Sequence, residues 1–197
     1  SMASIPTIFL QNASTIANIT LGNSATDGGQ GYIDSLTLGG TSSIGSIVNN
    51  RGTISSIALN GASTITNGIT NASGGTISNI TLASSNTINN GIANEGNIGT
   101  IINDTSNTTQ VSNAGTIGVI SINQGEIDYS GDGIITEELV VEDGATLSIN
   151  GGAGIITMGS DFGSKLNLKE GSTFNGAIKN IGFVDTLEVT GNISGGI

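Results

Sequence analysis

Cysteine, histidine and tryptophan are all missing from this sequence of 197 residues, and proline occurs once. Without thiol or imidazole groups, the chain has no cysteine nucleophile, no histidine base and none of the cysteine and histidine ligands of typical zinc sites. These absences exclude the commonest routes to covalent and zinc-assisted catalysis. The composition therefore already disfavours an enzyme.

Aromatic residues make up only 3% of the chain and charged residues only 10%. Aromatic and leucine side chains supply most of the buried area in an ordinary globular core, so this chain needs another kind of core. A disordered chain would combine low hydrophobicity with high charge, whereas isoleucine is frequent and regularly spaced here. The composition favours a core of stacked isoleucine, valine and leucine.

Basic residues are scarce, because four lysines and arginines stand against 15 aspartates and glutamates, giving a formal net charge of −11. Nucleic acids and anionic lipid surfaces are recognised through clustered lysine and arginine, and the basic residues here lie far apart. No apolar run approaches the roughly 18 residues that a membrane span needs. We expect no nucleic-acid partner and no membrane insertion by this part of the protein.

The chain instead contains a repeat, which is written out twice in residues 52–99. The first copy contains TISSIAL from Thr53 and TITNGITN from Thr64, and the second contains TISNITL from Thr76 and TINNGIAN from Thr87. The offset between the copies is 76 − 53 = 23 residues. A repeat of this size, with β-branched apolar residues alternating at period two within each run, indicates one coil of a solenoid built from short strands.

The repeat extends beyond these two copies in a less regular form. The first isoleucine of each unit falls at positions 33, 54, 77, 98 and 117, at intervals of 21, 23, 21 and 19 residues. Glycine, asparagine or serine interrupts the apolar pattern too often for long helices. The sequence predicts an all-β solenoid with coils of about 19–23 residues, in which isoleucine and leucine face inward and threonine, serine and asparagine face outward.

The chain is interpreted as one solenoid preceded by four residues that do not belong to it. Residues 1–4 read as an expression scar, and residues 5–197 as a single β-solenoid fragment of a longer protein. Residues 5–121 hold the regular coils rich in isoleucine, asparagine and glycine, whereas residues 122–197 are more varied. The charge also changes: the first 120 residues hold four acidic and one basic residue (net −3), and the rest hold eleven acidic and three basic residues (net −8).

Four asparagines recur at equivalent places in the repeat, each shortly before a glycine: Asn49, Asn71, Asn94 and Asn113. Asparagine tolerates the left-handed backbone conformation and bonds nearby backbone groups, so these residues suit tight corners. Stacked in register, their amides would instead bond one another along the solenoid, as in other parallel β stacks. The sequence leaves both interpretations open, the simple turn residue and the structural asparagine ladder.

One local motif suggests a metal site. Asp128, Ser130 and Asp132 occupy the first, third and fifth positions of a calcium-loop pattern, with glycine at the sixth. The twelfth position is Leu139 rather than the bidentate glutamate that such loops require. An Asp-Gly turn at a coil corner is the alternative, and calcium is the only cofactor that the sequence suggests.

Two later phrases carry a resemblance to a known family. ELVVEDGATLSING from Glu138 and KLNLKEGSTFNG from Lys165 resemble the passenger domains of type V bacterial autotransporters, and residues 52–122 are similar to their isoleucine-, asparagine- and glycine-rich repeats. The resemblance implies a right-handed parallel β-helix that is secreted and displayed at the bacterial cell surface, beyond the outer membrane. Such domains commonly act as adhesins, aggregation factors or stalks for a toxin or protease.

The leading functional hypothesis is a structural and adhesive module without enzymatic activity. Its polar rows and corner loops would contact a host or bacterial surface protein or glycan, or other copies of the chain. Many weak contacts along a rigid rod would supply the affinity.

Two alternatives come from other functional classes. A carbohydrate-active β-helix, either a polysaccharide lyase or a hydrolase, would use carboxylates among Asp132, Glu137, Glu138, Glu142 and Asp143. An ice-binding solenoid would use the threonines at 53, 76 and 116 as one ladder.

Overall fold

The computed structural model describes residues 3–22, 30–150, 155–158, 164–180 and 184–194. Within these ranges the chain forms strands, turns and bends without any helix, and therefore without a helix that could cross a membrane. The strand pairs run parallel from coil to coil. The predicted all-β solenoid is confirmed, and its right-handedness remains a prediction.

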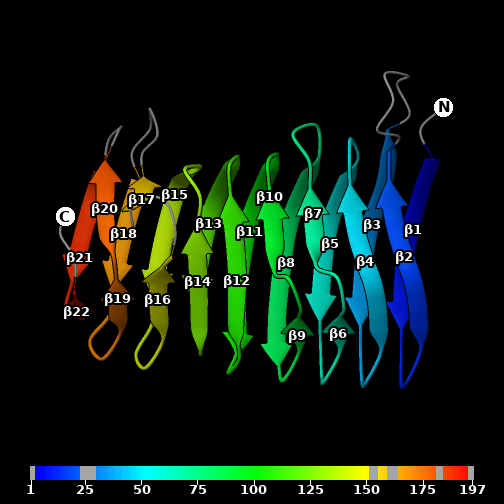
Figure 1. The fold of residues 1–197 in the computed structure, drawn as a ribbon, viewed down its shortest axis with the longest axis horizontal. Coiled ribbons are helices and arrows are strands. Elements are labelled where there is room, and N and C mark those ends of the chain that lie inside the picture. The colour runs from blue at the N-terminus through cyan, green and yellow to red at the C-terminus, as the bar shows by residue number, and fades with distance from the viewer. Residues whose placement is uncertain (1–2, 23–29, 151–154, 159–163, 181–183, 195–197) are drawn as a thin grey trace.

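Two sheets lie one behind the other, and successive coils add strands to both (Figure 1). Sheet A contains β1 (Ala3–Leu10), β3 (Gly31–Leu38), β5 (Thr53–Leu59), β8 (Thr76–Ser84), β11 (Asn97–Thr105), β13 (Thr116–Ile122), β15 (Ile134–Val141), β17 (Ile155–Met158), β18 (Ser164–Leu168), β20 (Ala177–Asn180) and β21 (Val184–Val189). Sheet B contains β2 (Thr15–Leu21), β4 (Ser43–Asn49), β6 (Thr64–Ile65), β7 (Ile69–Asn71), β9 (Thr87–Ile88), β10 (Ile92–Asn94), β12 (Thr108–Asn113), β14 (Glu126–Ser130), β16 (Thr146–Ile149), β19 (Thr173–Asn175) and β22 (Asn192–Ile193).

The register of sheet A confirms the coil lengths read from the sequence. Ile33 pairs with Ile54, and Ile54 pairs with Ile77. The pairing continues from Ile77 through Ile98 to Ile117. We call such a row of aligned side chains from successive coils a file. All five side chains are buried, so the spacing of the first isoleucine in each unit measures the coil directly.

The inward and outward alternation is interrupted once in each long strand. In β5, Ile54, Ile57 and Leu59 are fully buried, whereas Ser55 and Ser56 between the first two are both half-buried. The same order of buried and half-buried positions occurs in β4. The expectation that inward and outward residues alternate along the whole run is therefore wrong here. The strand bends and places two consecutive residues on the outside.

Neighbouring coils approach closely at the bend. A Cβ atom on Gly99 would lie 2.5 Å from the carbonyl oxygen of Ser78, and one on Gly118 would lie 2.5 Å from the carbonyl oxygen of Gly99. Both distances are far below an ordinary contact, and the obstacle is backbone, which has little freedom to move. The bend therefore requires glycine in β11 and β13.

In the later coils the same bend is where sheet A divides. Ile135 of β15 pairs with Met158 of β17, whereas Leu139 of the same strand pairs with Leu166 of β18. Residues 159–163, which separate β17 from β18, lie outside the described residues. Strand pairing nevertheless continues from β13 through β15 and β18 to β21, so the later coils extend the same stack.

The core is one cluster of stacked aliphatic side chains between the two sheets. Tyr129 and Phe174 are its largest fully buried members. Burying one isoleucine or leucine contributes about 1.5–3 kcal/mol, so the aliphatic files are the main source of stability. This arrangement explains how a chain with so few aromatic residues forms a core.

Candidate functional site

The four repeated asparagines form one buried file along the inner side of sheet B. Backbone pairing aligns Asn49 with Asn71, Asn71 with Asn94, and Asn94 with Asn113. Each Nδ2 donates to the Oδ1 of the next amide, at 2.9, 2.8 and 2.8 Å in chain order. All four side chains are at most 1% exposed. Of the two interpretations left open by the sequence, this geometry is that of an inward amide ladder.

The same amides also bond the corner that follows each strand. Asn71 Nδ2 lies 3.3 Å from the carbonyl oxygen of Gly75 and 3.1 Å from that of Asn97. A Cβ on Gly75 would lie 2.4 Å from Asn71 Oδ1, which explains why a glycine follows the asparagine. Each amide thus ties its own corner to the neighbouring coils, and the role of the file is structural.

Tyr129 ends the ladder, a role that the sequence analysis missed. Asn113 Nδ2 donates to Tyr129 Oη at 2.9 Å, although the backbone of Tyr129 pairs with Val111 rather than with Asn113. Burial raises the pKa of the Tyr129 hydroxyl from 10.0 to about 12; the Asn113 hydrogen bond lowers it in part, and the Asp132 carboxylate adds to the rise. The signal was available, because Tyr129 follows buried Ile127 at period two.

The three residues of the calcium-loop pattern do not share one face. Asp128 and Ser130 lie on the outer side of β14, with the buried Tyr129 between them. Asp132 is exposed in the corner beyond Gly131, whose φ is +101°. Among the described residues no group of three or more carboxylates is placed to hold a metal ion. Calcium binding remains a prediction. The alternative interpretation, an Asp-Gly turn at a coil corner, agrees with the position of Asp132 beyond Gly131.

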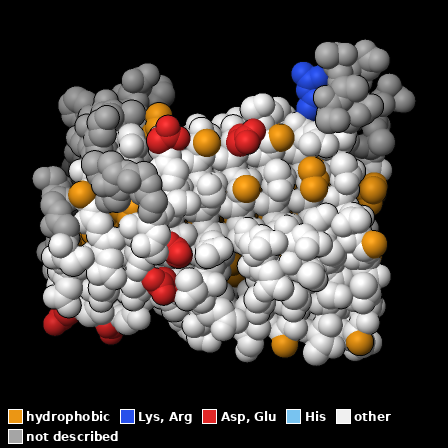
Figure 2. Space-filling model, in the orientation of Figure 1, with side chains coloured by type: hydrophobic (Ala, Val, Ile, Leu, Met, Phe, Trp, Pro, Cys, Tyr) orange, Lys and Arg blue, Asp and Glu red, His pale blue; other side chains and the backbone are white. Residues whose placement is uncertain are grey.

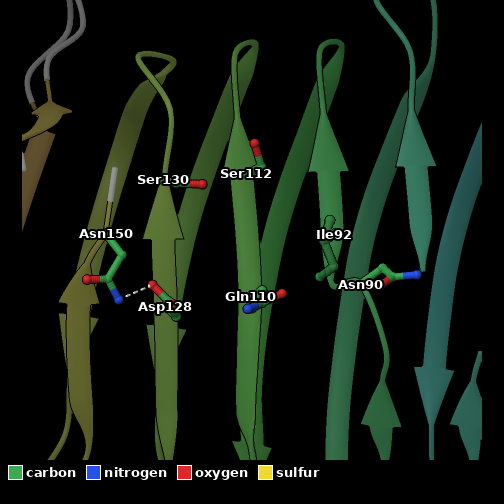
Figure 3. A pocket seen from close by; sticks show the side chains of 7 residues that line it. All are labelled: Asn90, Ile92, Gln110, Ser112, Asp128, Ser130 and Asn150. Atoms are coloured by element: carbon green, nitrogen blue, oxygen red, sulfur yellow. Dashed lines mark hydrogen bonds between the residues drawn. The ribbon is translucent and has the colours of Figure 1, made fainter. Parts of the chain in front are cut away.

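A shallow polar depression lies on the outer face of sheet B, over β10, β12 and β14 (Figure 3). Its volume is about 200 Å³. Seven residues line it: Asn90, Ile92, Gln110, Ser112, Asp128, Ser130 and Asn150. They come from successive coils, and six of the seven are polar. Asp128 accepts a hydrogen bond from Asn150 Nδ2 at 2.7 Å. The space-filling view shows a face dominated by uncharged polar side chains and backbone (Figure 2).

The depression was also missed from the sequence, although the coil period was a usable signal. Gln110 pairs with Asp128, and Ser112 pairs with Ser130, each at a separation of 18 residues (128 − 110 and 130 − 112). Residues one coil apart with the same inward or outward orientation are neighbours on the surface. Listing outward polar residues at the coil spacing would have brought these side chains together.

The acidic residues considered for catalysis are spread along one strand and both of its corners. Asp132 precedes β15, Glu137 and Glu138 lie within β15, and Glu142 and Asp143 follow it. An extended strand advances about 3.3 Å per residue, so Asp132 and Asp143 are far apart. The five carboxylates do not converge on one cleft.

The threonines considered for ice binding do share a row. Thr53 pairs with Thr76, and the row continues through Asn97 to Thr116. A second outward row on sheet A is mixed in composition, in the order Ala58, Thr81, Ile102 and Ser121. Sheet A thus presents one threonine-rich row without a matching second row beside it.

Three comparisons, with protein-family models, with curated proteins and with solved structures, found no match. Function is therefore inferred from the geometry of the chain itself.

Proposed function

We propose that this chain is a rigid structural and adhesive module whose outer polar rows bind a host or bacterial surface protein or glycan. One observation carries the proposal: uncharged hydroxyl side chains stand in register on the outside of sheet B over four successive coils. Thr15, Ser43, Thr64 and Thr87 follow one another in one row. Farther along the stack, Glu126 pairs with Thr108 and Thr146, and Thr146 pairs with Thr173.

The mechanism is repeated weak contact. Parallel neighbours lie about 4.8 Å apart, so each row presents hydroxyl groups at short, regular intervals. Each exposed hydrogen bond contributes little by itself, but contacts made by one rigid body add without a separate ordering cost for each. The buried ladders of isoleucine and asparagine supply this rigidity.

The proposal extends to location. The two phrases that resemble autotransporter passenger domains lie in corresponding strand, turn and strand segments: Leu139 pairs with Leu166, and Leu147 pairs with Phe174. The resemblance of these aligned phrases is what supports the proposal that the chain is secreted to the bacterial cell surface. Protease treatment of intact cells that express the full-length protein tests this, since an internal protein would be degraded only after lysis.

Binding to immobilised surface glycans and extracellular proteins tests adhesion. Thr64→Glu with Thr87→Glu places two like charges side by side on sheet B, and Thr53→Glu with Thr76→Glu does the same on sheet A. We expect the sheet B pair to weaken binding at least about tenfold, and the sheet A pair to leave it nearly unchanged. Equal losses from both pairs, or no binding by the unmodified chain, would contradict the proposal.

A further inference from the structure

We propose that the depression over β10, β12 and β14 binds one neutral sugar ring of a glycan. This inference rests on the proposed adhesive function and names the ligand class for one site on its surface. Three features carry it: the shape of the depression, the hydrogen-bonding groups that line it, and the placement of its single charge.

The shape follows from two residues with small or no side chains in β10 and its preceding corner. Gly91 aligns beside Gln110, whose backbone carbonyl oxygen would lie 2.3 Å from a Cβ at that position. Ala93 pairs with Ser112 in the next coil. The outer surface is therefore low here, while Asn90 stands on one side and Asp128 on the other (Figure 3). The result is a shallow trough across the strands.

The lining groups match a molecule whose hydroxyls both donate and accept hydrogen bonds. The amides of Asn90, Gln110 and Asn150 each carry one acceptor oxygen and two N–H donors, of which Asn150 already gives one to Asp128. The two serine hydroxyls can both donate and accept. Adjacent sugar hydroxyls need such mixed partners. A phosphate or sulfate group would instead need basic residues, and none lines the depression.

The position of Asp128 is already fixed before a ligand arrives. Its Oδ1 accepts the Asn150 amide at 2.7 Å, which leaves the second carboxylate oxygen to accept a ligand hydroxyl. Hydrogen bonds to a charged acceptor are about twice as strong as neutral ones. Because Asp128 is the only charged lining residue, an acidic sugar would be repelled.

The size limits the ligand to one ring. Pockets for drug-sized molecules are about 300–1,000 Å³, whereas this depression holds about 200 Å³. Among the lining residues only Ile92 is apolar, and it is 1% exposed, so there is no anchor for a hydrophobic peptide side chain. A single site of this kind would bind weakly, with a Kd of about 1 mM, and gain strength through repetition of weak contacts.

The test is a titration of the isotopically labelled chain with methyl glycosides of neutral hexoses and N-acetylhexosamines, followed by amide NMR shifts. We expect at least one neutral glycoside to shift the amides of Gly91, Ser112 and Ser130 in a saturable way. Glucuronate should bind at least about tenfold more weakly, and calcium alone should not shift these three amides. Shifts by calcium alone would reassign the depression to a metal, and the absence of saturable shifts by any neutral glycoside would overturn the inference.

Two variants give the matched comparison. Asp128→Asn keeps the size of the side chain but removes the free carboxylate oxygen, and should weaken glycoside binding at least about tenfold. Glu126→Gln removes a charge from the same face of the same strand but lies outside the depression, where Glu126 accepts a bond from Thr108 at 3.2 Å. Equal affinities of the two variants would contradict the assignment. If glycosides fail to bind while the threonine row still mediates adhesion, only this inference falls; if the chain adheres to nothing, the proposed function falls with it.

Discussion

The two corners of a coil solve the same problem with different residues. Several long strands, among them β4, β5, β8 and β13, begin with a Thr-Ile or Ser-Ile pair, and an inward residue lies near the corner that follows. On sheet A, Leu38 and Leu59 end β3 and β5, and Leu82 aligns with Leu59 two residues before the end of β8; we call this the Leu corner. On sheet B, β4, β7, β10 and β12 end on the four asparagines of the ladder; we call this the Asn corner. The leucines of the Leu corner and the asparagines of the Asn corner are almost fully buried.

The difference lies in where the hydrogen bonds of each turn come from. At the Leu corner a side chain within the turn supplies the bond: Ser42 Oγ donates to the Gly39 carbonyl at 2.7 Å, Ser63 Oγ to that of Asn60 at 3.3 Å, and Asn86 Nδ2 to that of Ala83. At the Asn corner the inward amide itself supplies it. The core can therefore end on an apolar residue only where the turn satisfies its own carbonyl groups.

One coil carries the natural exception. Asn103 occupies the file of the Leu corner, between Leu82 and Ile122. It is fully buried, and its Nδ2 donates to the Gln124 carbonyl at 2.7 Å while its Oδ1 accepts from Thr109 at 3.1 Å. An amide is thus tolerated in the apolar file when local partners satisfy it, without a ladder of neighbours.

The largest expected effect comes from placing a charge inside the Asn corner. In Asn71→Asp, a carboxylate oxygen would replace the Nδ2 that donates to Asn94 Oδ1 at 2.8 Å. Two acceptors would then face each other in a dry site, so we expect a loss of about 3–5 kcal/mol in the free energy of unfolding. Denaturant unfolding followed by circular dichroism measures this. Asn89→Asp, at an exposed position of the neighbouring coil, should change stability by less than about 0.5 kcal/mol.

A second prediction exchanges one corner's residue for the other's. Leu59→Asn would place an amide between Leu38 and Leu82, neither of which offers a hydrogen bond from its side chain. The loss of leucine burial and the unsatisfied amide should together cost about 3–4 kcal/mol. Leu82→Asn is the control, because it would lie beside Asn103 and regain part of this loss. Equal melting temperatures for the two variants would show that a neighbouring amide does not help.

The sequence predicted the files but not the distinction between the corners. Register followed from isoleucine spacing because each coil must bury the same positions, and a slip of one residue would turn every side chain around. The alignment of Asn71 with Asn94 followed in the same way. The direction of the amides did not, because asparagine is equally common as an exposed turn residue. The bend at Ser55 and Ser56 also escaped prediction, although the spacing of Ile54, Ile57 and Leu59, three and then two residues apart, was a usable signal.

The candidate site was less predictable than the fold. Tyr129 is a single inward aromatic residue, and its role depends on Asn113, which is 16 residues away. The depression depends on small residues in one coil and polar residues in the following coils. Such features become visible only after the coil register is known, because they join outward positions from different repeats.

A smaller effect on stability is expected from the Tyr129 hydroxyl, which accepts the hydrogen bond of the last amide in the ladder. Its pKa rises from 10.0 to about 12 in the folded chain. The stabilisation is therefore fully present below pH 10 and is lost as the pH rises through 12, by up to about 3 kcal/mol. Unfolding measured at intervals between about pH 9 and 12 should show this decline.

Tyr129→Phe is the matched variant. It should lose about 1–2 kcal/mol at neutral pH, because Asn113 Nδ2 loses the hydroxyl that it reaches at 2.9 Å. The decline above pH 10 should become shallower, because the buried hydroxyl that produces it is absent from this variant. A variant that shows the same pH dependence as the original chain would place the titration elsewhere.

The smallest effect concerns the corner that follows the last ladder asparagine along the stack, at Gly131 and Asp132. Here the question is whether calcium replaces the amide in holding the turn. Asp128 faces outward and is hydrogen-bonded to Asn150, whereas Asp132 lies past the corner, so the two carboxylates do not converge. The turn is already held by the neighbouring coil, because the Gly133 amide donates to the Asn113 carbonyl at 2.8 Å. We therefore expect millimolar calcium to change the melting temperature by less than about 1 °C, since a ligand that does not bind the folded state adds no stability.

Calorimetry with calcium and with a chelator, on the original chain and on Asp132→Ala, measures the difference. A calcium-dependent rise that disappears in Asp132→Ala would mean that a metal does at this corner what the asparagine amide does at the others.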